Sequence, residues 1–331
     1  MEPADRDRRP VAAPSGPAPQ SAPHPLRPTP REDEPPRWAP NNLTLRLLTA
    51  LLLVPPVIWA CYTGGWPYVA VVMAFILVGL NEFYGLISAK GASPLRLLGN
   101  IAAASLPVIA YVGDASLATS ALTATLLTLM ILQLTKQEIH EAIASVSETF
   151  FGVIYVGWLL SYAVSVRCIS DELGRRFGAQ IDPQVGFFYV ILCLAAVVWS
   201  DAGAYFVGRR YGRRKLAPAI SPNKTVEGAV GGVLTGGVAA VLAKLVFTAL
   251  PGGLARDLDW GASLLFGMVL AAFGVVGDLI ESLLKRDAAI KDAGHLLPGV
   301  GGVLDRIDSA LIGIPVMYYL LLAYYWTRYS T

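Results

Sequence analysis

The sequence predicts an all-α, polytopic integral membrane protein with about nine transmembrane helices, its N-terminus inside and its C-terminus outside. Of its 331 residues, 54% are hydrophobic and 15% are charged, and the mean hydropathy is +0.53. Soluble domains carry about 25% charged residues, so lipid is the expected solvent. Apolar runs of about 17–25 residues, the length that a helix needs to cross a bilayer, recur from Leu43 onward. Lys and Arg are concentrated in alternate loops between these runs.

The N-terminal segment, residues 1–42, is predicted to be a disordered cytoplasmic tail. Its first forty residues contain twelve of the 23 prolines and almost no large apolar side chains. Such a segment cannot bury enough surface to offset its ordering entropy. It is not a signal peptide, because it lacks an apolar core region. Residues 43–331 then form the membrane domain.

The apolar runs define nine predicted transmembrane segments. Their bounds are residues 44–62, 66–88, 97–113, 117–135, 148–167, 185–207, 225–250, 261–284 and 308–327. They should be helices, because a helix satisfies its own backbone hydrogen bonds in lipid, and the alternating pattern of a membrane barrel is absent. The seventh segment contains paired glycines, which predict close helix packing. These glycines are Gly231, Gly232, Gly236 and Gly237.

The distribution of basic residues predicts the orientation of the chain. With the N-terminus inside, twenty of the 26 Lys and Arg residues fall on the inner side, five fall on the outer side, and Lys244 lies within a predicted span. The positive-inside rule favours this N-in, C-out arrangement. Two long polar loops, residues 208–224 and 285–307, then face the cytoplasm or its equivalent.

Charge and cysteine content exclude other classes of function. The net charge of +2 is too small to indicate a nucleic-acid partner. Cys61, Cys168 and Cys193 are scattered without CxxC spacing, which predicts neither a disulfide framework nor a zinc site. The polar residues inside and between the spans are therefore the functional candidates.

Four ionisable residues lie within predicted spans, namely Glu82, Asp201, Lys244 and Asp278. Such residues are costly in a bilayer and are functional candidates by default. Asp278 shares one helix stripe with two downstream polar residues, Ser282 at i+4 and Lys285 at i+7. This stripe is either part of a site or an internal Asp278–Lys285 salt bridge that cancels charge.

The stretch "SPNKT" predicts an anion site at the start of a helix. Ser221 is a plausible N-cap and Pro222 suits the first helical position. Lys224 and Thr225 would then lie in the first turn beside free backbone N–H groups. The GxxxxGK spacing of a Walker loop is missing.

The last polar loop combines charges of both signs with a glycine-rich turn. Asp305 and Asp308 are three residues apart and share a face if they are helical. Mg²⁺ commonly binds one or two carboxylates together with substrate phosphates. Glycines at positions 299, 301 and 302 would let the backbone approach a phosphate closely. The alternative is that these charges only form Asp–Arg bridges.

This loop resembles the signature of the phosphatidate cytidylyltransferase (CDP-diacylglycerol synthase) family, S-x-x-K-R-x4-K-D-x-G-x-x-x-P-G-H-G-G-x-x-D-R-x-D. Thirteen positions match in register: Ser282, Lys285, Arg286, Lys291, Asp292, Gly294, Pro298, Gly299, Gly301, Gly302, Asp305, Arg306 and Asp308. The upstream stretches "SDAGAYFVGRRYG" and "SPNKTVEG" also look like blocks of that family, so the motif-level resemblance covers roughly residues 190–310. The chain departs from the signature at Val300, where the family has His.

The resemblance implies transfer of CMP from CTP to phosphatidic acid, which gives CDP-diacylglycerol and pyrophosphate. The catalytic residues that it implies are Asp278, Lys285, Arg286, Lys291, Asp292, Asp305, Arg306 and Asp308, and the substrate-binding residues are Asp201, Ser221, Lys224, Thr225, Ser282, Gly299, Gly301 and Gly302. Mg²⁺ would bind Asp278, Asp305 and Asp308, with room for a second cation. The family also implies a homodimer. We expect a bacterial inner membrane with the active site facing the cytoplasm; an organelle membrane is the alternative.

Three other functions remain open on the sequence. A polyprenol or phytol kinase would also use CTP, but it would direct an alcohol at the γ-phosphorus. A transporter could use Asp201, Asp278 and Glu82 as ion sites, although no internal repeat is evident. A degenerate homologue is the third alternative, and Val300 is its only indication.

Overall fold

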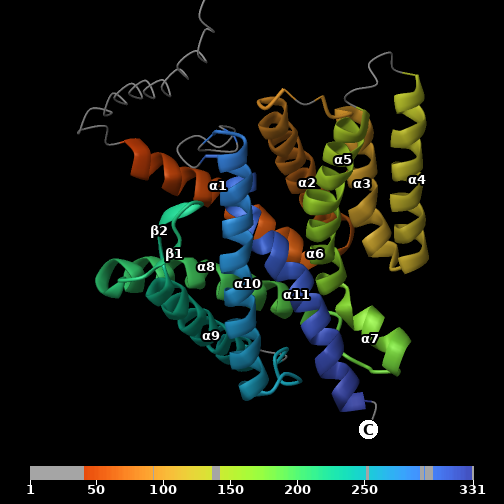
Figure 1. The fold of residues 1–331 in the computed structure, drawn as a ribbon. Helices are drawn as coiled ribbons and strands as arrows, with labels where there is room; N and C mark the ends of the chain where they lie inside the picture. Colours follow the sequence, from red (N-terminus) through yellow and green to blue (C-terminus); the bar gives the residue numbers. More distant parts are fainter. Residues whose placement is uncertain are drawn as a thin grey trace, which may run out of the picture. The chain divides into compact units, whose positions relative to one another are not determined.

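The described part of the chain folds into a bundle of helices with a small β-hairpin (Figure 1). The computed structural model describes residues 41–91, 93–135, 142–250, 253–290, 294 and 301–329, with side chains from Leu51 onward. The helices are α1 (Asn41–Thr63), α2 (Gly65–Ser88), α3 (Arg96–Val112), α4 (Ala115–Leu134), α5 (Ala142–Gly152), α6 (Leu159–Arg167), α7 (Ile169–Phe177), α8 (Val185–Tyr211), α9 (Val226–Ala249), α10 (Trp260–Asp287) and α11 (Leu304–Tyr329). A π-helical turn, Val153–Trp158, joins α5 to α6.

Seven helical segments in the described part of the chain are long and apolar enough to cross a membrane. They are α2, α4, the continuous segment Ala142–Arg167, and α8 to α11. Two further apolar helices, Leu51–Thr63 and Arg96–Val112, are shorter. Every predicted span coincides with one of these helices, so the prediction of a helical, polytopic membrane protein is confirmed. The count of nine and the orientation stay predictions, and most of the predicted tail lies outside the described residues.

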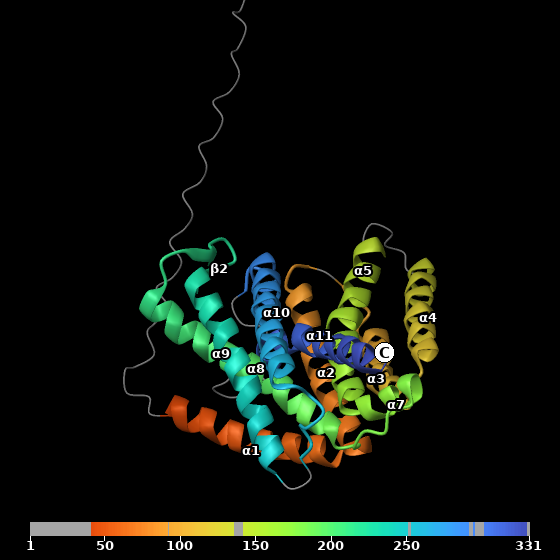
Figure 2. The same cartoon turned by 90° about the horizontal axis from the view of Figure 1, so that it is seen from below.

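The helices form two groups with α10 and α11 between them (Figures 1 and 2). In both views, α4 lies at the edge of one group, beyond α2, α3 and α5, while α8 and α9 form the other group. Small residues let α8, α9 and α10 pack closely. A Cβ at Gly231 would lie 2.5 Å from Val207, and one at Gly236 would lie 2.5 Å from the Ala271 Cβ. The predicted packing role of the paired glycines is therefore confirmed.

The hairpin between α8 and α9 departs from the all-α prediction. Strands β1 (Lys215–Ala217) and β2 (Ser221–Thr225) pair antiparallel. The prediction of a helix start at Ser221 is wrong, because this residue pairs with Ala217 in the hairpin. Thr225 is the N-cap of α9 instead, and its Oγ1 accepts a hydrogen bond of 3.1 Å from the Gly228 N–H. The strand pairing thus moves the helix start four residues along the chain.

The hairpin closes through backbone contacts with the first turn of α9. The Val226 N–H donates to the Arg214 carbonyl at 2.9 Å, and the Glu227 carboxylate accepts from the Arg213 and Arg214 N–H groups at 3.0 and 3.1 Å. The Val226 and Gly228 N–H groups at the actual start of α9 therefore already have protein acceptors. These contacts hold β2, and with it Lys224, beside the end of α8.

Candidate active site

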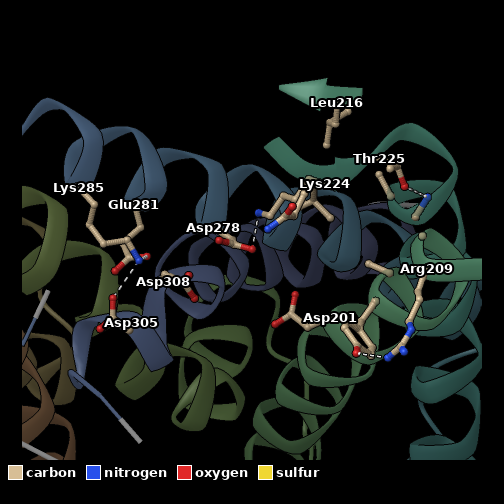
Figure 3. A pocket seen from close by; sticks show the side chains of 17 residues that line it. Asp201, Arg209, Leu216, Lys224, Thr225, Asp278, Glu281, Lys285, Asp305 and Asp308 are labelled. Atoms are coloured by element: carbon tan, nitrogen blue, oxygen red, sulfur yellow. Dashed lines mark hydrogen bonds and ion pairs between the residues drawn. The ribbon is translucent and has the colours of Figure 1, made fainter. Parts of the chain in front are cut away.

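A cavity of about 660 Å³ lies where the hairpin meets α8, α9, α10 and α11 (Figure 3). Its lining includes seven of the predicted site residues: Asp201, Lys224, Thr225, Asp278, Lys285, Asp305 and Asp308. Tyr205, Arg209 and Leu216 also contribute to its wall. Described residues of the two polar loops that the sequence singles out, such as Lys224 and Lys285, thus meet at one place, although two long helices separate them in the chain.

Of the five carboxylates that line this cavity, three form a close group. Oxygen atoms of Asp278, Glu281 and Asp308 all lie within 4.8 Å of one another. Asp278 and Glu281 are three residues apart and therefore share a face of α10. Asp308 comes from α11, whose backbone passes very close to α10 at Gly277. A Cβ on Gly277 would lie 2.6 Å from the Asp308 carbonyl oxygen, so only glycine permits this approach.

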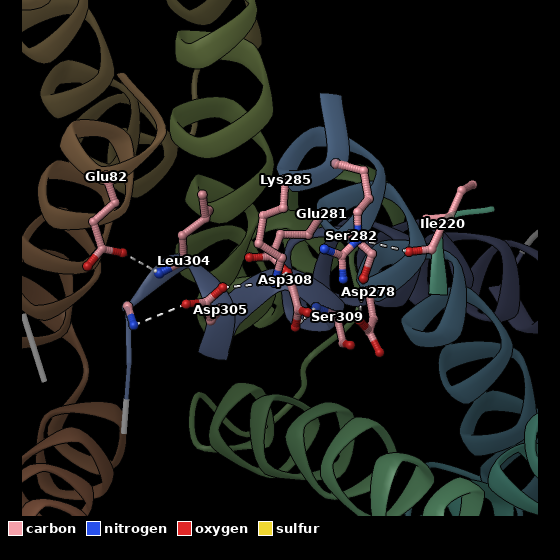
Figure 4. A network of polar contacts seen from close by, with 12 residues as sticks. Glu82, Ile220, Asp278, Glu281, Ser282, Lys285, Leu304, Asp305, Asp308 and Ser309 are labelled. Atoms are coloured by element: carbon pink, nitrogen blue, oxygen red, sulfur yellow. Dashed lines mark hydrogen bonds and ion pairs between the residues drawn. The ribbon is translucent and has the colours of Figure 1, made fainter. Parts of the chain in front are cut away.

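Two lysines face the carboxylates from different elements. Lys224 of β2 forms an ion pair with Asp278. Lys285 of α10 binds Glu281 Oε2 at 2.7 Å and Asp305 Oδ1 at 2.9 Å. The Asp278–Lys285 bridge that the sequence left open is not formed, because each residue has another partner (Figures 3 and 4). The cavity therefore holds its two lysines against separate carboxylates.

Asp305 lies next to the group formed by Asp278, Glu281 and Asp308 but is not one of the three. Its Oδ1 binds Lys285, and its Oδ2 accepts a hydrogen bond of 3.1 Å from the Gly302 N–H. Asp305 thus links Lys285 to the first turn of α11. The resemblance implies that Asp305 binds the metal, and that role stays a prediction.

The other predicted residues divide into two sets. Ser221, Ser282, Arg286, Gly301, Gly302 and Arg306 are described but do not line the cavity. Ser282 donates to Asp278 Oδ1 at 3.4 Å, and the Arg286 Nε donates to the Ile220 carbonyl at 3.4 Å, which ties α10 to the hairpin (Figure 4). Lys291, Asp292, Gly299 and Val300 lie outside the described residues.

Glu281 is the functional candidate that the sequence analysis missed. Its side chain is only 1% exposed, and its Oε1 is enclosed and accepts no hydrogen bond from the described residues. An acidic residue three positions after Asp278, inside an apolar segment, was the signal that could have found it. A carboxylate oxygen without a donor, beside two further carboxylates, fits a hard divalent cation, which prefers oxygen ligands.

Residues 44–324 match the sequence model of the cytidylyltransferase family. The chain belongs to this family. A phosphatidate cytidylyltransferase of Synechocystis is 31% identical over 84% of this chain and 96% of its own length. A phosphatidate cytidylyltransferase of Brucella melitensis is 34% identical over 84% and 93% of the two chains. That of Bacillus subtilis is 43% identical over 51% of this chain, a match that spans 55% of the relative's length.

Membership of the cytidylyltransferase family confirms the resemblance that the glycine-rich loop indicates. The match extends beyond the motif-bearing residues to nearly all of the membrane domain. The acidic cavity is therefore the candidate active site of a cytidylyltransferase family member.

Proposed function

We propose that this protein transfers CMP from CTP to phosphatidic acid and releases pyrophosphate, which gives CDP-diacylglycerol for phospholipid synthesis. The observation that carries the proposal is one cavity, lined by long apolar helices and the hairpin, in which a close group of three carboxylates lies beside two lysines. Both substrates are anionic phosphates, and one of them is a lipid. Such a cavity lets a water-soluble nucleotide meet a lipid headgroup.

The lysines supply the charge that this reaction needs. Lys224 and Lys285 approach from β2 and α10, so they can bind phosphate oxygens from two sides of the cavity. When phosphates enter, the ammonium groups exchange a carboxylate oxygen for a phosphate oxygen. The charge that develops on the departing pyrophosphate is then met by groups that are already in place.

The carboxylates fit a cation. Asp278, Glu281 and Asp308 would hold a divalent ion, which the resemblance implies to be Mg²⁺ and which would supply charge neutralisation at the phosphates when bound. The resemblance adds Asp305 to this ligand set, as well as a second cation. Measurements of metal affinity and stoichiometry on the Asp305→Asn variant would test both the Asp305 ligand and the second cation.

The chemistry requires no strong general base. An oxygen of the lipid phosphate, already ionised at neutral pH, attacks the α-phosphorus of CTP in line. One P–O bond forms to the lipid as the bond to pyrophosphate breaks. The contribution of the chain is then mainly to position and neutralise the two phosphates. This explains how Val300 can stand where the family has His.

The remaining expectations concern the membrane and assembly. We propose nine spans with the N-terminus inside, a bacterial inner-membrane location, an active site facing the cytoplasm and a homodimer. The excess of Lys and Arg on one side supports the orientation. Arg286, Lys291 and Arg306 are proposed to bind phosphate, and Asp292 is proposed as a further catalytic residue, on the strength of the signature alone.

The test is formation of CDP-lipid from CTP and phosphatidic acid by the purified protein in detergent with Mg²⁺. Asp278→Asn should reduce turnover by about 100-fold or more, since it removes a charge that acts in the transition state. Asp287→Asn is the matched control, because Asp287 ends the same helix but is exposed and pairs with Lys90. No product from the native protein, or equal loss in both variants, would contradict the proposal.

A further inference from the structure

We propose that Glu82 of α2 is a positioning residue of the active site, which fixes the start of α11 and thereby the place of Asp308 in the acidic group. The inference rests on the function proposed above and deepens it. Glu82 does not line the cavity. It lies on the other side of the α11 N-terminus from the carboxylates, as Figure 4 shows.

The contact that carries the inference joins residues that are 222 positions apart. Glu82 Oε2 accepts a hydrogen bond of 2.7 Å from the backbone N–H of Leu304, the first residue of α11. The first N–H groups of a helix have no acceptor within the helix. A carboxylate is favoured there, because the helix dipole places partial positive charge at this end. A side chain of α2 thus caps α11 from outside.

The glycine-rich segment leaves room for this carboxylate. A Cβ at Gly302 would lie 2.9 Å from Glu82 Oε2, and one at Gly294 would lie 2.4 Å from Glu82 Oε1. Both glycines are signature positions. The lack of a side chain at these two glycines therefore makes room for the Glu82 carboxylate, a role separate from close approach to a phosphate.

A second contact places α2 against the same turn of α11. A Cβ at Gly79, three residues before Glu82, would lie 3.3 Å from Ile307 Cδ1. Glu82 and Gly79 therefore hold α11 at Leu304 and Ile307, on either side of Asp305 and next to Asp308. Because Asp308 lies within 4.8 Å of Asp278 and Glu281, a small shift of this turn would separate the three carboxylates.

The free-energy cost of burying the Glu82 carboxylate argues against a role in packing alone. It lies six residues before the end of an apolar α2, and its Oε1 is enclosed and accepts no hydrogen bond from the described residues. Burial of such an atom without a donor is unfavourable. An apolar residue at this position would leave the Leu304 N–H without the acceptor that Glu82 supplies.

The test compares Glu82→Gln and Glu82→Asp with the native protein, in detergent and without nucleotide. Glu172→Gln is the matched control, because Glu172 is paired with Arg175 and Arg176 on α7, which packs at the C-terminal end of α11. Hydrogen exchange of the peptide that covers residues 301–309 reports the cap. Mn²⁺ binding, measured by its paramagnetic resonance signal, reports the carboxylate geometry.

We expect exchange at Leu304 to quicken and the Mn²⁺ dissociation constant to rise, each about tenfold, as loss of one hydrogen bond to a charged group predicts. At saturating metal, turnover should stay within about threefold of native, because no group that touches substrate has changed. Gly302→Ala should produce the same shift in Mn²⁺ affinity, because its new Cβ would push against the Glu82 carboxylate. Its effect should not add to that of Glu82→Gln, since both disturb the same contact.

Two results would overturn the inference. One is native exchange at residues 301–309 together with native Mn²⁺ affinity in both Glu82 variants. The other is an equal change in Glu172→Gln, which would indicate general loosening of the bundle. Absence of CDP-lipid formation by the native protein, with the expected shifts in exchange and Mn²⁺ affinity, would refute the proposed function and leave the positioning role standing.

Discussion

Replacing Gly277 with alanine should impair the active site without removing any polar group from it. The new Cβ would lie 2.6 Å from the Asp308 carbonyl oxygen and 3.1 Å from the Ser309 Cα. Ordinary contact begins at 3.4 Å, so the backbone of α11 must withdraw by about 0.8 Å at Asp308. A misplacement of about 1 Å can cost about 100-fold in rate, and we therefore expect turnover to fall by about 10- to 100-fold.

The effect on stability should be smaller. Overpacking of this kind costs about 1–3 kcal/mol. Alanine regains about 1 kcal/mol over glycine within a helix, so the free energy of unfolding should fall by up to about 2 kcal/mol. Thermal unfolding in detergent measures this change, and CDP-lipid formation over a range of Mg²⁺ concentrations measures the change in activity.

Gly274→Ala is the matched control for this prediction. It lies one turn earlier on α10 and faces the same part of α11, but its Cβ would meet Val197 and Ser309 at 3.6 and 3.7 Å. These are ordinary contacts, so activity should stay near native. Equal turnover and equal Mg²⁺ dependence in the Gly277 and Gly274 variants would refute the argument that close helix approach sets the carboxylate geometry.

Three further predictions follow from the site. Lys224→Met should tighten Mn²⁺ binding about fivefold, because Asp278 loses its ion-pair partner, and it should lower turnover by about tenfold or more. Lys224→Arg keeps the charge and should change neither quantity. Unchanged Mn²⁺ affinity in Lys224→Met would show that the Lys224–Asp278 ion pair does not compete with the metal. Thr225→Ala should lower the free energy of unfolding by about 1 kcal/mol through loss of the α9 cap, whereas Thr225→Ser should keep it; equal melting temperatures would contradict the cap. Val300→His should change turnover by less than about tenfold, since the ionised lipid phosphate needs no base, and a larger gain in the turnover assay would mean that the family His matters here.

The membrane helices could be predicted from the sequence because hydropathy is a local property. Each predicted span coincides with a helix, and the long apolar runs alone determine this. The hairpin could not be found in the same way. Its three- and five-residue strands form only because Lys215 pairs with Thr225 and Ala217 pairs with Ser221, a contact that competes with a good local cap signal at Ser221.

The candidate site was predictable in composition but not in pairing. The sequence singled out Asp278 as an ionisable residue within a span and Lys285, Asp305 and Asp308 as signature positions, and the structure places all four in one cavity. The carboxylate with which each lysine forms an ion pair depends on tertiary packing. Lys285 has acidic residues at both i−7 and i−4 on its own helix, and its partner Asp305 lies twenty residues further on. The contact between Glu82 and Leu304 has no local signal at all.

The fate of the CTP phosphates tests the central claim most directly. The purified protein would receive phosphatidic acid with CTP that carries a radioactive label at either the α- or the γ-phosphorus. The proposed reaction places the α-label in the lipid and releases the γ-label as pyrophosphate. A γ-label in the lipid product would indicate a CTP-dependent kinase instead, and the absence of either label from lipid, under conditions in which the protein is folded, would contradict phosphatidate cytidylyl transfer.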